Sequence, residues 1–250
     1  MPSPSIVEKS IVAELAPTGV LRAGINMSNF LLVSGTSASG DPVGVASDMA
    51  RAIADRLGVP VAYQKFPRPG ELADAADDGV WDIGLIGAEP ARAQKIAFSP
   101  AYVEIASTYL VPAGSPLRTI EEVDRPGIRI AVTARTAYEL WLSRHIRHAE
   151  LVMSESLDAA MEQFVAEQLD ALAGLKPRLL KDVEKLPGAR ILDGQFSAVQ
   201  QAIGTLRPRE AGAAFLRDFV EEAKASGLVA SLIERHRIQG LSVAPPAPPA

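Results

Sequence analysis

The sequence predicts a mixed α/β fold in two lobes, and three observations lead to this prediction. Short apolar runs alternate with amphipathic segments along most of the 250 residues, which is typical of βαβ units with parallel strands. The alternation restarts after the turn-rich stretch 112–116. Two helical segments near the end of the chain have no strands of their own. We therefore expect the chain to return to its first lobe, giving lobe 1 over 1–110 with 197–250 and lobe 2 over 111–196.

Hydrophobic spacing justifies the individual elements. A helix is predicted over 45–57, because apolar side chains recur at every fourth position from Val45 to Leu57, and Gly58 follows as its C-cap. The other expected strands are 19–26, 59–66, 81–86, 128–132, 151–153, 169–175 and 190–192, and the other expected helices are 70–78, 137–148, 157–167, 179–186, 209–226 and 229–237. The Pro/Ala tail, 243–250, is expected to be disordered.

Composition excludes several classes of function. The chain is 48% hydrophobic and 22% charged, as in an ordinary soluble protein, and its net charge of −5 argues against a nucleic-acid-binding or anionic-membrane surface. There is no cysteine, which excludes disulfides, thiol nucleophiles and cysteine metal sites. His145 and His148, three apart on a predicted helix, could bind a metal, but no third ligand is evident. We therefore expect no metal and no cofactor.

The beginning of the chain bears on location. Residues 1–16 carry Glu8, Lys9 and Glu14 within an apolar pattern, so they lack the basic-then-apolar layout of a secretory signal. No apolar run approaches the roughly 20 residues that span a bilayer. Both the periplasm and the cytoplasm therefore stay open on this evidence.

Three segments of the chain resemble the family 3 extracellular solute-binding proteins, the amino-acid receptors of ABC importers, and they occur in the same order as in that family. The segments are 40–58, 81–102 and 128–138, and the similarity as a whole covers about 16–239. The most specific motifs lie in the second segment, which contains Trp81-Asp-Ile-Gly and the stretch from Arg92 to Phe98-Ser-Pro-Ala-Tyr102. This resemblance implies a two-lobed periplasmic-binding-protein-like (type II) fold. The return of the chain to its first lobe by itself predicts two crossings that would form a hinge, near 109–112 and 196–203. The resemblance further implies closure on a small ligand between the lobes, an ABC permease as partner, a periplasmic location and a monomer.

The resemblance also implies roles for particular residues. Arg92 occupies the position whose guanidinium grips the ligand carboxylate, a pairing that suits the bidentate geometry of arginine. The alternative is a solvated arginine paired with Glu89. In the second lobe, Arg135-Thr136-Ala137 occupies the turn that binds the same carboxylate at a helix N-terminus. Arg135 replaces the usual glycine, and Thr136 is equally explained as the N-cap of the helix.

Other candidates are less specific. Asn26, Asn29 and Phe30 follow the first strand, at the edge where parallel sheets bind ligands, although the asparagines could be turn formers and Phe30 could belong to the core. Glu89 lies in a segment that is shorter and poorer in hydroxyl groups than in amino-acid receptors. Lys176 follows Leu175, where those receptors place an aspartate that pairs with the ligand ammonium; alternatively Lys176 points to solvent. The ligand is therefore expected to be a carboxylate, either an organic acid or an amino-acid-like molecule, without an essential ammonium group.

The sequence thus favours a receptor that binds a small carboxylate-bearing solute for an ABC importer, and not an enzyme. Two alternatives remain at this point. One is a cyclohexadienyl-dehydratase-like enzyme on the same scaffold, with Glu89 or Glu104 as its acid. The other is a cytoplasmic ligand-binding sensor.

Overall fold

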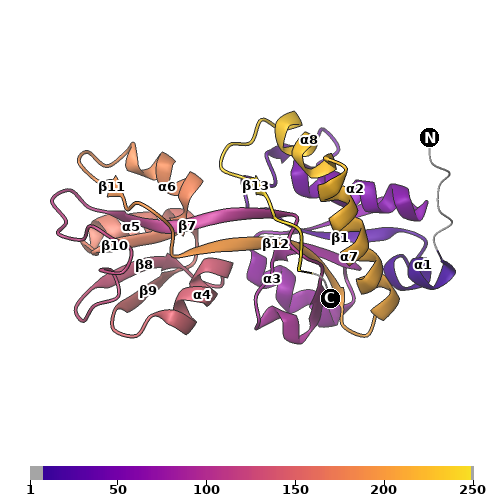
Figure 1. Cartoon of the computed structure of the whole chain (residues 1–250), viewed down its shortest axis with the longest axis horizontal. Helices are drawn as coiled ribbons and strands as arrows, with labels where there is room; N and C mark the ends of the chain where they lie inside the picture. Colours follow the sequence, from indigo (N-terminus) through magenta and orange to yellow (C-terminus); the bar gives the residue numbers. More distant parts are fainter. Residues whose placement is uncertain (1–7, 249–250) are drawn as a thin grey trace. The chain divides into compact units, whose positions relative to one another are not determined.

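A computed structural model describes residues 8–248, which divide into two compact units (Figure 1). Unit 1 extends to Glu104 and resumes at Gln200, and unit 2 comprises Ile105–Val199. The chain passes between the units within two strands, β7 (Val103–Val111) and β12 (Ser197–Leu206). Both units combine parallel strands with helices, which confirms the predicted α/β class.

The sheet of unit 1 is built on parallel strands. Strand β1 (Leu21–Asn26) lies between β4 (Val61–Phe66) and β5 (Ile83–Gly87), and both neighbours run parallel to it. Strand β12 continues the sheet antiparallel beside β5. The shorter strands of this unit are β2 (Gly35–Thr36), β3 (Pro42–Val43), β6 (Ile96–Phe98) and β13 (Ser242–Val243). The parallel arrangement brings the carboxyl ends of β1, β4 and β5 to one edge.

Helices α2 (Val45–Leu57) and α3 (Pro69–Asp74) of unit 1 pack directly on this sheet. Helix α2 has the predicted bounds, and Gly58 ends it with a left-handed φ of 69°. Met49 and Ile53 on α2 are fully buried, which stabilises the fold by about 1.5–3 kcal/mol for each side chain. The other helices are α1 (Lys9–Leu15), α7 (Glu210–Ala225), α8 (Leu228–Arg235) and the 3₁₀ helices Ala75–Asp78 and Arg92–Gln94. Helix α8 packs against α2 and α7, as Figure 1 shows.

A buried ion-pair network lies near the amino end of β1. The Asp82 carboxylate is fully buried, and its Oδ1 lies 2.8 Å from Nη2 of Arg22 and 3.0 Å from Nη1 of Arg209. Asp82 precedes β5, Arg22 belongs to β1, and Arg209 is the N-cap of α7. The hydrogen bonds to Asp82, which outweigh partial burial, raise the pKa of Arg22. Asp82 therefore joins three segments of the unit-1 core.

Unit 2 repeats the architecture with other segments. Strand β8 (Arg129–Thr133) lies between β9 (Glu150–Ser154) and β10 (Ala171–Leu175), all parallel. Antiparallel β7 pairs with β10, and β11 (Arg190–Ile191) pairs with β7. Helices α4 (Ala137–His145), α5 (Leu157–Ala166) and α6 (Lys176–Val183) each begin within four residues after a parallel strand. Three helix N-termini therefore lie at the carboxyl edge of this sheet.

The structure corrects three details of the sequence prediction. Helix α4 ends at His145, because Ile146 is extended, so His148 does not share its helix. Helix α6 begins at Lys176 and not at 179, since Pro177 is well suited to the first turn of a helix. Helix α1 was not predicted. It is held by α7, where the N–H of Gly212 donates to Oε2 of Glu14 at 2.7 Å.

The proline-rich tail is also ordered as far as residue 248, contrary to prediction. Ser242 and Val243 pair with β7 opposite Glu104 and Val103. The next residue, Ala244, is buried, and its N–H donates to the carbonyl of Tyr102 at 3.1 Å. Prolines lack an N–H but adopt extended geometry, so such a segment can lie on the edge of a sheet. Residues 249 and 250 of the predicted disordered tail lie outside the described residues.

No helix within 8–248 is long and apolar enough to cross a membrane.

Candidate functional site

Arg92 lies at the carboxyl edge of the unit-1 sheet. It begins the 3₁₀ turn Arg92–Gln94, which follows β5 after a short loop. The residue is only 6% exposed, and its Nη1 donates to the carbonyl oxygen of Gly87, the last residue of β5, at 2.7 Å. The guanidinium is therefore held against the end of a parallel strand, where α/β sheets commonly bind ligands.

The polar residues after β1 reach the same edge. Asn26 ends β1, and its Oδ1 accepts hydrogen bonds from the Oγ of Ser28 at 2.8 Å and from the N–H of Ser28 at 3.2 Å. Oδ1 of Asn29 accepts from the N–H of Leu31 at 3.2 Å. Both asparagines are buried, and these bonds confirm that they form turns. Phe30, which follows Asn29 in the chain, is only partly buried.

Glu89 and Glu104, the two candidate acids of the alternative enzyme, both belong to unit 1. Glu89 lies in the loop between β5 and Arg92; it is 9% exposed, and its carbonyl accepts from the N–H of Ala93. Glu104 lies at the end of unit 1, where its Oε1 accepts from Nε2 of Gln200 at 2.8 Å. The Gln200 amide and the Glu104 carboxylate thus join the two chain segments that leave this unit.

The turn before α4 forms the corresponding edge of unit 2. Thr136 is the N-cap of α4: its Oγ1 accepts from the N–H of Glu139 at 3.2 Å and donates to the carbonyl of Thr133 at 2.9 Å. This confirms the predicted capping role. Arg135 has a φ of 62°, the left-handed conformation that glycine adopts most easily. The turn therefore has a glycine-type backbone although its residue is arginine.

Glu139 is a part of this turn that the sequence analysis missed. It is 4% exposed, and its Oε2 accepts from the N–H of Arg135 at 2.7 Å while its Oε1 accepts from the Oγ of Ser143 at 2.6 Å. A signal was present, because Thr136-x-x-Glu139 has the spacing of a capping box. In a capping box the carboxylate accepts from the N–H of the N-cap residue, whereas here the Glu139 carboxylate accepts from the N–H of Arg135, the residue before the N-cap. Ala137, the third predicted residue of the turn, begins the helix and is buried.

Lys176 begins α6 directly after β10 and is partly exposed. Two residues further along α6, Nε of Arg178 lies 2.8 Å from Oδ2 of Asp182, and its Nη2 lies 2.6 Å from Oδ1 of Asp158. The hydrogen bond from Arg178 lowers the pKa of the Asp158 carboxyl. The carboxylates of Asp158 and Asp182, like that of Glu139, are therefore already engaged by groups of the protein.

An aromatic cluster on α4 and its neighbours was also not predicted. The ring of Phe196 lies 4.6 Å from that of Tyr109 and 5.6 Å from that of Trp141, between ring centroids. Trp141 stacks on His145 at 3.8 Å. Within residues 8–248, no group of three or more histidine, aspartate or glutamate side chains could hold a metal ion.

The structure thus places the candidate residues in two sets, each at the carboxyl edge of its own sheet. The unit-1 set is Asn26, Asn29, Phe30, Glu89 and Arg92, and the unit-2 set is Arg135, Thr136, Ala137 and Lys176. In unit 1 the set follows β1 and β5, and in unit 2 it follows β8 and β10.

Comparison with solved structures shows the fold. A mutant of ArgBP from T. maritima is 22% identical, with 92% of this chain and 100% of that chain covered and a TM-score of 0.72. The ancestral amino acid-binding protein AncCDT-1, a precursor of cyclohexadienyl dehydratase, is 20% identical over 91% of this chain and 99% of that one, with a TM-score of 0.73. A histidine kinase sensor domain with similarity to periplasmic binding proteins is 16% identical over 90% and 97% of the chains, at a TM-score of 0.71. These similarities confirm the predicted two-lobed periplasmic-binding-protein-like fold.

Comparison with curated protein sequences gave no match. The family model for bacterial extracellular solute-binding proteins, family 3, matches residues 21–237. This match includes strands β1 to β12 and both sets of candidate residues described above. The chain therefore belongs to the bacterial extracellular solute-binding proteins, family 3.

Proposed function

We propose that this protein binds a small carboxylate-bearing solute and delivers it to an ABC permease outside the cytoplasm. Arg92 in unit 1 and the Arg135–Ala137 turn in unit 2 both contact the solute in this proposal. The observation that supports it most is the buried Arg92 guanidinium, held at the carboxyl end of β5 by the Gly87 carbonyl. Family membership supports a solute-binding role in general.

The chemistry of the two sets suits a carboxylate. A guanidinium offers planar, paired N–H donors that match the two carboxylate oxygens, and charge-assisted bonds are the stronger kind of hydrogen bond. The first N–H groups of α4 have no acceptor within the helix, so the turn can bind an anion at a positive helix end. The left-handed backbone at Arg135 shapes this turn.

We further propose that the solute needs no ammonium group. A buried ammonium requires a counter-charge, because an unpaired ion in the protein interior costs several kcal/mol. At the carboxyl end of β10 the chain carries Leu175 and then Lys176, whose charge would repel an ammonium and attract a second anionic group. The nearby carboxylates of Glu139 and Asp182 already accept hydrogen bonds from the protein.

A thermal-shift screen, followed by calorimetry, tests the proposal. The panel contains keto acids, dicarboxylates, aromatic acids and the twenty amino acids. A solute present at about 100 times its Kd stabilises the protein by about 2.7 kcal/mol, which such a screen resolves. We expect stabilisation by a carboxylate without an ammonium group. Micromolar binding of an amino acid whose ammonium contacts an acidic side chain would refute the proposal that the solute needs no ammonium group. Binding only of solutes without a carboxylate would refute the proposal that the protein is a carboxylate receptor.

The two alternatives raised by the sequence are a dehydratase-like enzyme and a cytoplasmic ligand-binding sensor, and the structural relatives include a dehydratase precursor and a kinase sensor domain. An enzyme would turn over a prephenate-like substrate, and Glu89→Gln or Glu104→Gln would abolish that turnover. A cytoplasmic sensor would be found in the cytoplasmic fraction of cells that express the native gene. Our proposal predicts that the protein does not turn over such a substrate and is not found in the cytoplasmic fraction. It also predicts that cells take up the solute found in the screen only when the permease is present.

A further inference from the structure

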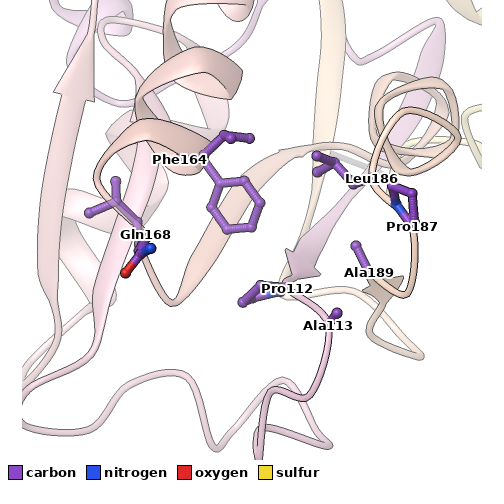
Figure 2. Close-up of a pocket in the computed structure, with 9 residues that line it drawn as sticks. Pro112, Ala113, Phe164, Gln168, Leu186, Pro187 and Ala189 are labelled. Atoms are coloured by element: carbon purple, nitrogen blue, oxygen red, sulfur yellow. The ribbon is translucent and has the colours of Figure 1, made fainter.

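Unit 2 contains a cavity of about 350 Å³ that is separate from the candidate residues. Its lining consists of Pro112, Ala113, Phe164, Val165, Gln168, Leu169, Leu186, Pro187 and Ala189. Gln168 is the only polar residue in this set, and none of the lining side chains is charged. Figure 2 shows the Phe164 ring among these groups, with Pro112 and Leu186 on either side of the space it faces.

The cavity lies at the opposite edge of the unit-2 sheet from the Arg135–Ala137 turn. Strand β7 runs antiparallel to β10 and ends at Val111, so Pro112 lies at the amino end of β10. Leu169 immediately precedes that end of the strand. Thr136, in contrast, follows the carboxyl end of β8, which is parallel to β10. A molecule in the cavity would therefore occupy a second site, independent of the proposed solute site.

The walls are preformed by rigid backbone. Pro112 and Pro187 each have a fixed φ. Gly188 lies beside Ala113, and a Cβ added at Gly188 would come within 2.9 Å of the Cβ of Ala113. With a φ of 79°, Gly188 also adopts a conformation that disfavours other residues. The two lining segments around Ala113 and Gly188 are thus packed against each other, and a ligand would not need to order them first.

We propose that this cavity binds a small, neutral, mainly apolar molecule of about two fused rings, with one hydrogen-bonding group directed at Gln168. A cavity of about 150 Å³ lined by apolar side chains holds benzene, so this one accommodates a larger ring system. The uncharged lining would leave an ionised group without a partner, which selects a neutral ligand. Within residues 8–248, no group bonds to the Gln168 side-chain amide, which is exposed and can serve as donor or acceptor.

Calorimetry with indole tests this proposal, because indole has two fused rings and one N–H donor. We expect one molecule to bind per chain. Ala189→Phe fills the cavity and should weaken binding by more than about tenfold, while Ala166→Phe, an exposed alanine of α5 outside the lining, should leave the Kd within about twofold. No binding up to the solubility limit of indole, or equal binding by wild type and Ala189→Phe, would overturn the proposal.

Two further variants and one spectroscopic measurement complete the test. Gln168→Leu should weaken indole binding while leaving naphthalene, which has no hydrogen-bonding group, unaffected. Arg92→Ala should leave indole binding unchanged, so failure of this site and failure of the solute site are distinguishable. If Ala189→Phe does not fold, amide shifts of the wild-type protein on adding indole replace it. Shifts centred on 164–169 and 186–189 support the proposal, and shifts centred elsewhere overturn it.

Discussion

The backbone N–H of Arg135 donates to Oε2 of Glu139 at 2.7 Å, across the first turn of α4. A left-handed conformation costs a non-glycine residue about 1–2 kcal/mol, and Arg135 adopts it with a φ of 62°. The hydrogen bond to Glu139 helps to offset this cost. The shape of the turn therefore depends on a buried carboxylate that is itself no candidate for contact with the solute.

Replacing Glu139 tests this dependence. Glu139→Ala leaves the Arg135 N–H and the Ser143 hydroxyl without their acceptor, which should lower the free energy of unfolding by about 1–3 kcal/mol. Urea unfolding at neutral pH measures the change. Glu162→Ala, on the exposed face of α5, is the matched control and should stay within about 0.5 kcal/mol of wild type. Equal losses in the two variants would contradict the anchoring role.

The Asp82 network should dominate the stability of unit 1. Asp82→Ala leaves Arg22 and Arg209 without the carboxylate that they share, and breaking a buried pair in this way costs about 3–5 kcal/mol. Asp193→Ala removes an exposed aspartate and should cost less than about 0.5 kcal/mol. The comparison is made by urea unfolding. An Asp82→Ala protein as stable as the control would show that the network contributes nothing.

Asp124 gives unit 2 a predictable response to acid. Its partial burial works to raise the pKa of the carboxyl, but hydrogen bonds from the N–H groups of Ala149, His148 and Arg147 lower it below the ordinary value of 3.8. A group whose folded pKa is lowered stabilises the fold above its unfolded pKa, and this contribution is lost as the pH falls through the folded pKa.

The expected outcome follows from this sign. Asp124→Asn should be less stable than wild type at pH 7, and the difference should shrink as the pH is lowered below 3.8. Unfolding free energies of the two proteins across this range measure it. A difference that stays constant, or one that grows in acid, would contradict the assignment.

The two roles of Thr136 can be separated. Thr136→Ala removes the cap of α4 and should cost about 1 kcal/mol of stability, whereas Thr136→Ser keeps the hydroxyl and should restore most of it. If Thr136 also contacts the solute, the alanine variant should bind it more weakly at a temperature where both variants are fully folded. Unchanged calorimetric binding by Thr136→Ala would leave it a helix cap alone.

The sequence predicts the fold well where a local pattern determines the structure. Helix α2 has the predicted bounds, because its apolar spacing and Gly58 are both local signals. The elements that were missed depend on distant contacts. Helix α1 packs on α7, and the Pro/Ala tail pairs with β7, neither of which a local pattern reveals.

The same distinction holds at the candidate site. The cap at Thr136 and the turns at Asn26 and Asn29 follow from residue type and position. The left-handed backbone of Arg135 was not predicted, because arginine disfavours this conformation and only the glycine usual at this position of the family points to it. The cavity of unit 2 was invisible for a related reason: its lining comes from three separate stretches of chain that become neighbours only in the folded unit.

Calorimetric titration of Arg92→Ala tests the central claim most directly. Hydrogen bonds to charged groups contribute about 1.5–3 kcal/mol, so the variant should bind the solute found in the screen at least about tenfold more weakly than wild type. The matched control is Arg217→Ala, an exposed arginine of α7, which should bind as wild type does. Thermal unfolding establishes that both variants are folded before titration. An Arg92→Ala protein that is folded and binds the solute with unchanged Kd would contradict the account.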